Sequence, residues 1–219
     1  MSTHPYYPPD LVIPNYEPNT RSLWALASVF SSVIGVFIGA VLAASHAVNG
    51  RLSRGEKLVI SWFSLCGFLH CFFEGYFVLF HASIAGRQSL FAQLWKEYSL
   101  SDSRYLVSDP FMVCIETVTT LLWGPLSLAA AAATALRSRL KPLLVAGVAV
   151  GHLYGVTLYY ATCFAEHAFT GRSHSRPETV YFWVYYVGFN MPWVVVPAGE
   201  CFLPCRALWG AERSGEERN

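Results

Sequence analysis

Acid and base side chains interrupt stretches of this sequence that are otherwise apolar. His70 and Glu74 stand four residues apart in one such stretch, and Glu116 stands in the next. Residues four apart on a helix lie one turn from each other on the same face, so His70 and Glu74 can share a proton. A charged side chain at the centre of a lipid bilayer costs about 3 kcal/mol even on lenient insertion scales, so each must face a partner or a polar cavity. The pattern indicates proton transfer inside a membrane protein.

Other polar side chains extend these helix faces. Thr119 lies three residues after Glu116 on the same face, and Asn190 and Trp193 lie three residues apart in the last apolar stretch. If the three faces converge, they enclose two carboxylates, an imidazole, a hydroxyl, an amide and an indole ring. We therefore predict one catalytic pocket lined by His70, Glu74, Glu116, Thr119, Asn190 and Trp193.

A simpler interpretation is that these polar side chains only hydrogen-bond between helices, as they do in many membrane bundles. That interpretation is weaker for two acids and a titratable base, because they cost more than helix contacts require. We prefer it for Glu200, which lies near the end of the last apolar stretch and can extend its carboxylate to the membrane surface.

Metal, nucleophilic and redox chemistry have little support in the sequence. His70 and Glu74 would supply only two metal ligands. The remaining histidines are scattered, mostly near the ends of apolar stretches or in loops: His4, His46, His81, His152, His167 and His174. The six cysteines lack the paired spacing of a zinc site, and a G-x-S-x-G elbow, a P-loop and a dinucleotide fingerprint are absent. We therefore predict no cofactor and no metal.

What remains is acid and base work on an apolar substrate. Such a pocket could protonate an isolated alkene and remove a proton from the adjacent carbon, with a carbocation between the two steps. Carboxylates and the face of the Trp193 ring suit this chemistry, because both stabilise positive charge in a dry site.

The elements that must position these residues are membrane-spanning helices. Hydrophobic residues make up 54% of the chain and charged residues only 13%, and the charges gather between long apolar runs. A bilayer core needs about 20 mainly apolar residues in a helix. The sequence predicts an all-α membrane protein, a bundle of five transmembrane helices, over residues 24–48, 58–82, 111–136, 143–165 and 180–203.

The segments between and around these stretches differ in character. Residues 1–23 form a proline-rich, irregular N-terminal arm without the features of a signal peptide. The longer connection 83–110 has apolar residues at helical spacing beside charged ones, which suggests a short interfacial helix that caps the bundle.

Charge distribution predicts the orientation and excludes one class of partner. Nine of the fifteen basic residues lie in the first connection, the third connection and the tail: Arg51, Arg54, Lys57, Arg137, Arg139, Lys141, Arg206, Arg213 and Arg218. Because short cytoplasmic loops are rich in Lys and Arg, we place the C-terminus in the cytoplasm. The net charge of +1, without a basic block, argues against nucleic acid as a partner.

Four blocks of sequence resemble a known family. They read CGFLHCFFEGYF at residues 66–77, LWKEYSLSDSRY at 94–105, CIETVTTLLWGPLSL at 114–128 and YFWVYYVGFNMPW at 181–193. In this order and composition they are similar to the emopamil-binding-protein family, whose shared domain is called EXPERA. The N-terminal arm and the C-terminal tail match only loosely.

The resemblance implies a sterol Δ8–Δ7 isomerase of sterol biosynthesis in the endoplasmic reticulum membrane. It implies that an acid protonates C9, that a base removes a proton from C7, and that cationic amphiphilic amines mimic the carbocation. It assigns Glu74 and His70 to the coupled proton donor and shuttle, and Glu116 to cation stabilisation or to the base. It further implies five helices, which we divide into a first transmembrane helix at 24–48 and a four-helix catalytic core at 58–203. The charge distribution makes residues 204–219 a cytoplasmic tail, and a homodimer stays open as a partner.

The sequence also departs from the family pattern, and it leaves a rival function open. Val156 stands where relatives carry an acidic residue, and the tail lacks a dilysine retrieval signal. The rival is a sterol- or amine-binding protein without chemistry, like the sigma-two-receptor relatives that share the helical domain. Those relatives have four spans and lack the pairing of His70 with Glu74, so we favour the enzyme.

Overall fold

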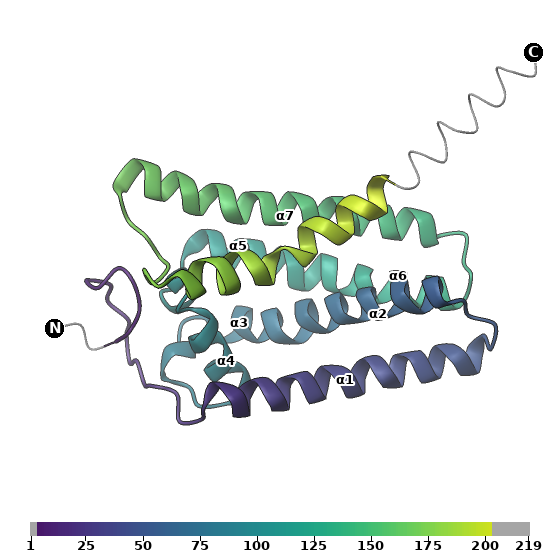
Figure 1. The fold of residues 1–219 in the computed structure, drawn as a ribbon, viewed down its shortest axis with the longest axis horizontal. Helices are drawn as coiled ribbons and strands as arrows, with labels where there is room; N and C mark the ends of the chain where they lie inside the picture. Colours follow the sequence, from purple (N-terminus) through teal and green to yellow (C-terminus); the bar gives the residue numbers. More distant parts are fainter. Residues whose placement is uncertain (1–3, 203–219) are drawn as a thin grey trace, which may run out of the picture.

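The computed structural model describes residues 4–202, and over this range the chain is helical with no strand. Four helical segments are long and apolar enough to cross a membrane, and they correspond to the first four predicted stretches. They lie side by side along the long axis of the molecule (Figure 1). Their parts are α1 (Leu23–Val48); α2 (Arg54–Phe68), η1 (Leu69–Glu74) and α3 (Gly75–Phe80); α5 (Pro110–Val118), η4 (Thr119–Trp123) and α6 (Gly124–Ala135); and α7 (Lys141–Thr170).

Local sequence signals set the ends of these helices. The Ser53 side chain accepts a hydrogen bond from the N–H of Glu56, whose carboxylate accepts one from the N–H of Ser53 in return. Asp109 caps α5, and Pro110 follows at the first helical position, where its missing N–H has no cost. Gly171 ends α7 with a φ of 72°, in the left-handed region that favours glycine.

The fifth predicted stretch is helical but broken. It becomes helical at residue 179, passes through the π-helical segment η5 (Tyr181–Gly188), is interrupted at Met191, and continues as a helix over residues 192–202. Pro192 explains the interruption, because proline lacks an N–H for the helix and disfavours the helical conformation of the residue before it. The described part of the predicted fifth stretch is therefore helical with one break, and it is not among the four helices that are long and apolar enough to cross a membrane. The predicted tail at 204–219 lies outside the described residues.

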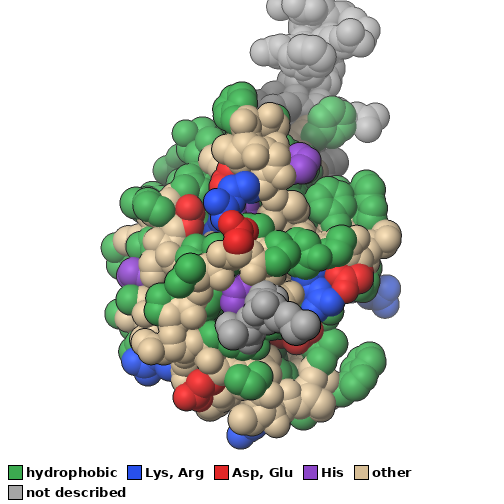
Figure 2. All heavy atoms as spheres, turned by 90° about the vertical axis from the view of Figure 1, so that its left-hand side faces the viewer, with side chains coloured by type: hydrophobic (Ala, Val, Ile, Leu, Met, Phe, Trp, Pro, Cys, Tyr) green, Lys and Arg blue, Asp and Glu red, His purple; other side chains and the backbone are tan. Residues whose placement is uncertain are grey.

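The short helix α4 (Leu90–Tyr98) closes one end of the bundle, with the turns η2 (Ile84–Gly86) and η3 (Ser103–Leu106) on either side of it in the chain (Figure 1). The N-terminal arm is irregular and is fastened to α4. The buried Lys96 ammonium donates to the Glu17 carbonyl at 2.8 Å. The Gln93 side-chain oxygen accepts from the backbone N–H groups of Thr20 and Arg21 at 3.0 and 2.9 Å. Figure 2, which faces this end, shows acidic and basic side chains close to one another among apolar ones.

The buried apolar residues form two clusters. One lies towards α4 and includes Phe77, Trp95 and Tyr105, all buried. The other joins α2, α6 and α7 and includes Ile60 and the small buried residues Ala130 and Ala131. In contrast, α1 is mostly exposed, as expected for a helix that faces lipid.

Candidate active site

A cavity of about 500 Å³ lies in the bundle, and all six residues predicted from the sequence line it: His70, Glu74, Glu116, Thr119, Asn190 and Trp193. Its wall is largely apolar and is built from α1, η1, α4, α5, η4, α7 and the fifth segment. The three polar helix faces therefore meet in one space. The catalytic roles assigned to these residues stay a prediction.

His70 and Glu74 form the centre of the polar wall. Both lie in η1, a π-helical turn of the kind that often marks functional sites in longer helices. His70 Nδ1 lies 2.9 and 2.8 Å from the two carboxylate oxygens of Glu74. The His70 residue is buried, and the Glu74 side chain is 16% exposed. The pairing expected from the four-residue spacing is present.

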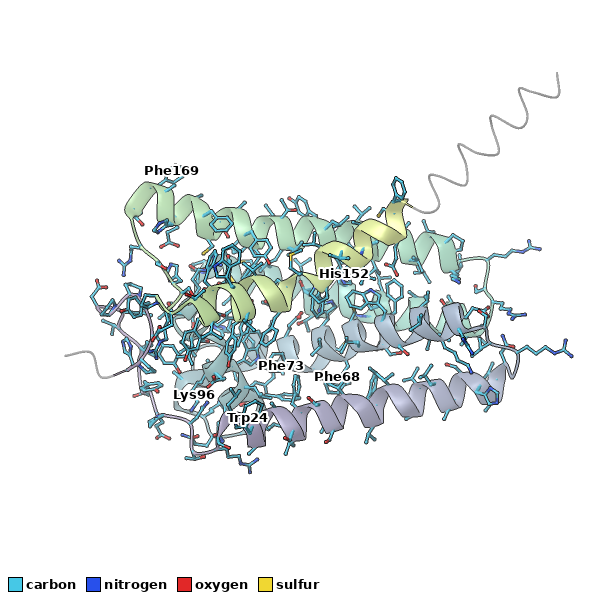
Figure 3. The ribbon with its side chains drawn as sticks, viewed as in Figure 1. Trp24, Phe68, Phe73, Lys96, His152 and Phe169 are labelled. Atoms are coloured by element: carbon cyan, nitrogen blue, oxygen red, sulfur yellow. The ribbon has the colours of Figure 1, made fainter. Side chains whose placement is uncertain are left out.

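His152 extends this pair across the bundle, and the sequence analysis missed it. Its Nε2 lies 3.0 Å from Nε2 of His70, and the residue is only 5% exposed. Its Nδ1 is buried without a hydrogen-bond partner among residues 4–202. Figure 3 places His152 about midway along the bundle. Its sequence signal was a histidine inside the apolar stretch 143–165, but nothing local indicated that it would face His70.

Glu116 is held by a residue from the connection before α5. The Tyr105 hydroxyl donates to Glu116 Oε1 at 2.7 Å, and both residues are buried. Burial and the negative charge of Glu116 raise the pKa of Tyr105 well above its usual value, so its hydroxyl stays a donor. The Glu74 carboxyl group lies close enough to interact with that of Glu116. The cavity therefore brings two acids together.

The remaining predicted residues complete the wall. The Thr119 hydroxyl donates to the carbonyl of Ile115 at 2.8 Å, so its hydrogen stays with its own helix. The Asn190 amide donates to the Tyr98 hydroxyl at 2.9 Å and to the Tyr186 carbonyl at 2.7 Å. The Trp193 ring centroid lies 6.2 Å from that of His70.

Helix α4 adds a second polar part of the wall, which sequence analysis did not identify. The Tyr185 hydroxyl donates to Glu97 Oε1 at 3.1 Å, and Tyr98 and Tyr159 share a hydrogen bond at 3.2 Å. Burial raises the pKa of Glu97, although the Tyr185 hydrogen bond acts in the opposite direction. Val156, the departure noted in the sequence, also lines the cavity and is buried.

Two further sets of residues bear on alternative chemistry. Glu200 is not among the residues that line this cavity. Cys66, His70 and His152 each offer one ligand atom, and these atoms lie within 4.8 Å of one another, so this set could hold a metal ion. A metal there would replace the hydrogen bond between the two histidines, since their Nε2 atoms are already paired. The absence of a metal and of a cofactor stays a prediction.

Comparisons with known proteins agree on one family. The family model described as EXPERA (EXPanded EBP superfamily) matches residues 90–202. The chain is 35% identical to the 3-beta-hydroxysteroid-Delta(8),Delta(7)-isomerase of Cavia porcellus, over 96% of this chain and 91% of that protein. It is 39% identical to the protein of the same name from Mus musculus, over 89% and 84%. It is 38% identical to that from Rattus norvegicus, over 97% and 91%.

Proposed function

The chain belongs to the EXPERA family, the expanded EBP superfamily, and we propose that it is a sterol Δ8–Δ7 isomerase. It transposes a ring double bond of a sterol within one molecule. The observation that carries this function is the arrangement of two acids and a paired histidine in the wall of a single, mainly apolar cavity inside a membrane bundle. Relatives named as isomerases match nearly the full length of the chain.

The reaction is balanced by one proton gained and one proton lost. The π electrons of the C8–C9 double bond form a C9–H bond with a proton from the enzyme, which leaves positive charge at C8. A base then removes a proton from C7, and the electrons of that C–H bond form the C7–C8 double bond. Because the double bond only moves, no electrons are exchanged with another molecule.

Glu74 and His70 supply the proton that is added at C9, and Glu116 acts in the second half of the reaction, on the cation or on the C7 proton. Both carboxyl groups line the same mainly apolar cavity, where a bound substrate can reach them. Glu74 gives its proton to C9, and His70 passes a proton to Glu74 through Nδ1 and takes up a replacement that is drawn ultimately from water. Glu116, oriented by Tyr105, stabilises the cation or removes the C7 proton.

The other three predicted residues stabilise the cation and position the substrate. The Trp193 ring presents its electron-rich face to the cation. Asn190, fixed by Tyr98, and Thr119 line the cavity where the ring system lies. Cationic amphiphilic amines inhibit by placing a positive charge where the carbocation forms.

The same proposal covers the membrane arrangement. The broken fifth segment completes five spans, as a first helix at 24–48 and a four-helix core at 58–203. The protein resides in the endoplasmic reticulum membrane with its tail, residues 204–219, in the cytoplasm, where basic residues of the short connections gather. It works in the lipid bilayer as a monomer or a homodimer.

The test is turnover by purified protein in detergent, with a Δ8 sterol, in heavy water and without added nucleotide, flavin or metal. We expect Δ7 product that carries one deuterium at C9, because the proton comes from titratable side chains that exchange with water. Single-turnover and many-turnover samples separate exchange with water from recycling of the C7 proton. A protein that binds the sterol without converting it would instead be the non-catalytic binding relative.

A further inference from the structure

The cavity contains one carboxylate that the proton transfer does not use. Glu97 lines the wall from α4, in the connection between the second and third spans. The proton-transfer residues lie instead on η1 and α5. A carboxylate in a largely apolar wall is costly to bury, so it calls for a ligand or a partner.

Glu97 has one hydrogen-bond partner, and the Arg176 guanidinium lies close enough to interact with its charge. Its Oε1 accepts from the Tyr185 hydroxyl at 3.1 Å, whereas Oε2 has no hydrogen-bond partner in the described part of the chain. The neighbouring Tyr98 hydroxyl is already engaged, by the Asn190 amide at 2.9 Å and by Tyr159 at 3.2 Å. Of these groups on α4, Glu97 is therefore the one free to accept a further hydrogen bond from a ligand.

The depth of Glu97 differs from that of the acid and base groups. Lys96, its neighbour in the chain, lies at the end of the bundle closed by α4, whereas His152 lies about midway along it (Figure 3). The cavity reaches both levels, since Glu97 and His152 line it together. One cavity therefore joins a polar end at α4 to the acid and base groups inside the bundle.

A sterol, like this cavity, has one polar end and a long apolar part. It carries one hydroxyl group at one end of a rigid apolar ring system, and in a bilayer this hydroxyl lies near the surface. Burying the hydroxyl without a hydrogen bond is unfavourable, so a site that takes up the ring must offer a partner for it. A charged acceptor serves better than a neutral one.

We propose that Glu97, positioned by Tyr185, accepts a hydrogen bond from the hydroxyl group of the substrate and thereby sets the direction in which the ring system enters the cavity. This inference rests on the proposed isomerase function. The hydroxyl end then lies at α4, and the ring double bond lies deeper, beside Glu74, His70 and Glu116.

The test compares two Δ8 sterols that differ only at C3, one with the 3β-hydroxyl and one without it. The measured quantity is the ratio of kcat/KM for the hydroxyl sterol to kcat/KM for the deoxy sterol. We expect Glu97→Leu to lower this ratio by roughly 10- to 100-fold, as for loss of a hydrogen bond to a charged group. Glu97→Gln should lower it less, and Tyr185→Phe should lower it in the same direction.

Tyr76→Phe is the matched control, because it removes a tyrosine hydroxyl that pairs with Ser89 at the start of α4 and does not line the cavity. The ratio should stay at the wild-type value in this variant. An unchanged ratio in Glu97→Leu, or a ratio that falls equally in Tyr76→Phe, would overturn the subsite. If the wild-type protein converts neither sterol, the isomerase function itself fails.

Discussion

His70 is hydrogen-bonded on both of its ring nitrogens, and this limits what it can do. Nδ1 faces Glu74 and Nε2 faces Nε2 of His152. Only one of the two histidines can donate in the Nε2 contact, so the tautomer of His152 determines the tautomer of His70. When His152 donates, His70 carries its proton on Nδ1, which is the form that can pass a proton to Glu74. His152 is thus a positioning residue for the acid.

Replacing His152 tests this coupling. We expect His152→Leu to lower kcat by about 10-fold or more, since a misplaced general acid loses part of its contribution. His152→Gln should restore most of the rate, because a side-chain amide can donate to His70 Nε2 without titrating. The measurement is kcat and KM across pH for the three proteins. If the glutamine variant is as slow as the leucine variant, His152 transfers a proton rather than only positioning His70.

The two acids of the cavity should distinguish charged from neutral ligands. Glu74→Gln and Glu116→Gln keep the size of the side chain and remove its negative charge. A protonated amine in the cavity gains Coulomb attraction that a neutral sterol does not, so we expect both variants to weaken amine binding more than sterol binding. Competitive binding in detergent gives both affinities. Equal losses for the two ligands would indicate that the carboxylates are structural.

At the scale of elements, π-helical turns and close helix contacts position the site. Two of the π segments, η1 and η4, carry site residues and pack against each other, with the Thr120 hydroxyl donating to the carbonyl of His70 at 3.1 Å. The carbonyls of a π turn lose their usual partners, and such a hydrogen bond between helices compensates for this. The local irregularity is therefore stabilised by the neighbouring span.

Glycines on α7 allow a second close contact. A Cβ atom added at Gly151 would lie 2.6 Å from the Trp123 ring, whereas one at Gly155 would meet nothing within 4 Å. Both glycines line the cavity. The Trp123 ring can therefore lie against the α7 backbone only because position 151 has no side chain.

Alanine at these two positions gives a matched pair. We expect Gly151→Ala to destabilise the protein by about 1–3 kcal/mol through overpacking against Trp123. Gly155→Ala should be neutral or stabilising by up to about 1 kcal/mol, because alanine favours the helix. Thermal unfolding in detergent checks the difference. Equal melting temperatures for the two variants would mean that Trp123 moves aside at no cost.

At the scale of the whole molecule, the N-terminal arm and the connections form a layer that closes the cavity at α4. Arg104, buried in this layer, pairs with Asp102 at 2.7 Å and donates to Thr162 on α7 at 3.1 Å. The Ser103 N–H donates to the His174 carbonyl at 3.1 Å. The bonds to Thr162 and His174 join segments that are far apart in the sequence, so the layer holds α4 and its Glu97 in place.

Lys96 tests the contribution of the arm to this layer. Lys96→Met removes the donor to the Glu17 carbonyl, so this oxygen loses its hydrogen bond. We therefore expect the free energy of unfolding to fall by about 1–3 kcal/mol. Lys57→Met, at an exposed position on α2, is the control and should have little effect. Melting temperatures in detergent measure both. A Lys96 variant as stable as wild type would show that the arm is fastened mainly by Gln93.

The sequence alone determined the features that depend on neighbours along the chain. Four spans could be predicted because apolar length is a local property, and the pairing of His70 with Glu74 because residues four apart on one helix must lie close together. The break in the fifth stretch was also readable, since Pro192 stands in its middle. Average hydropathy over a window conceals a single residue that cannot donate a helix hydrogen bond.

Tertiary structure alone decided the contacts between distant segments. His152 lies 82 residues from His70 in the chain, and Tyr185 lies 88 residues from Glu97. Neither pairing follows from helical periodicity, because periodicity states which residues share a face but not which neighbouring helix that face meets. The rotation of each helix is set by side-chain packing across the whole bundle. The sequence could therefore predict the acid and base groups, but only the packed bundle showed which side chains hold them.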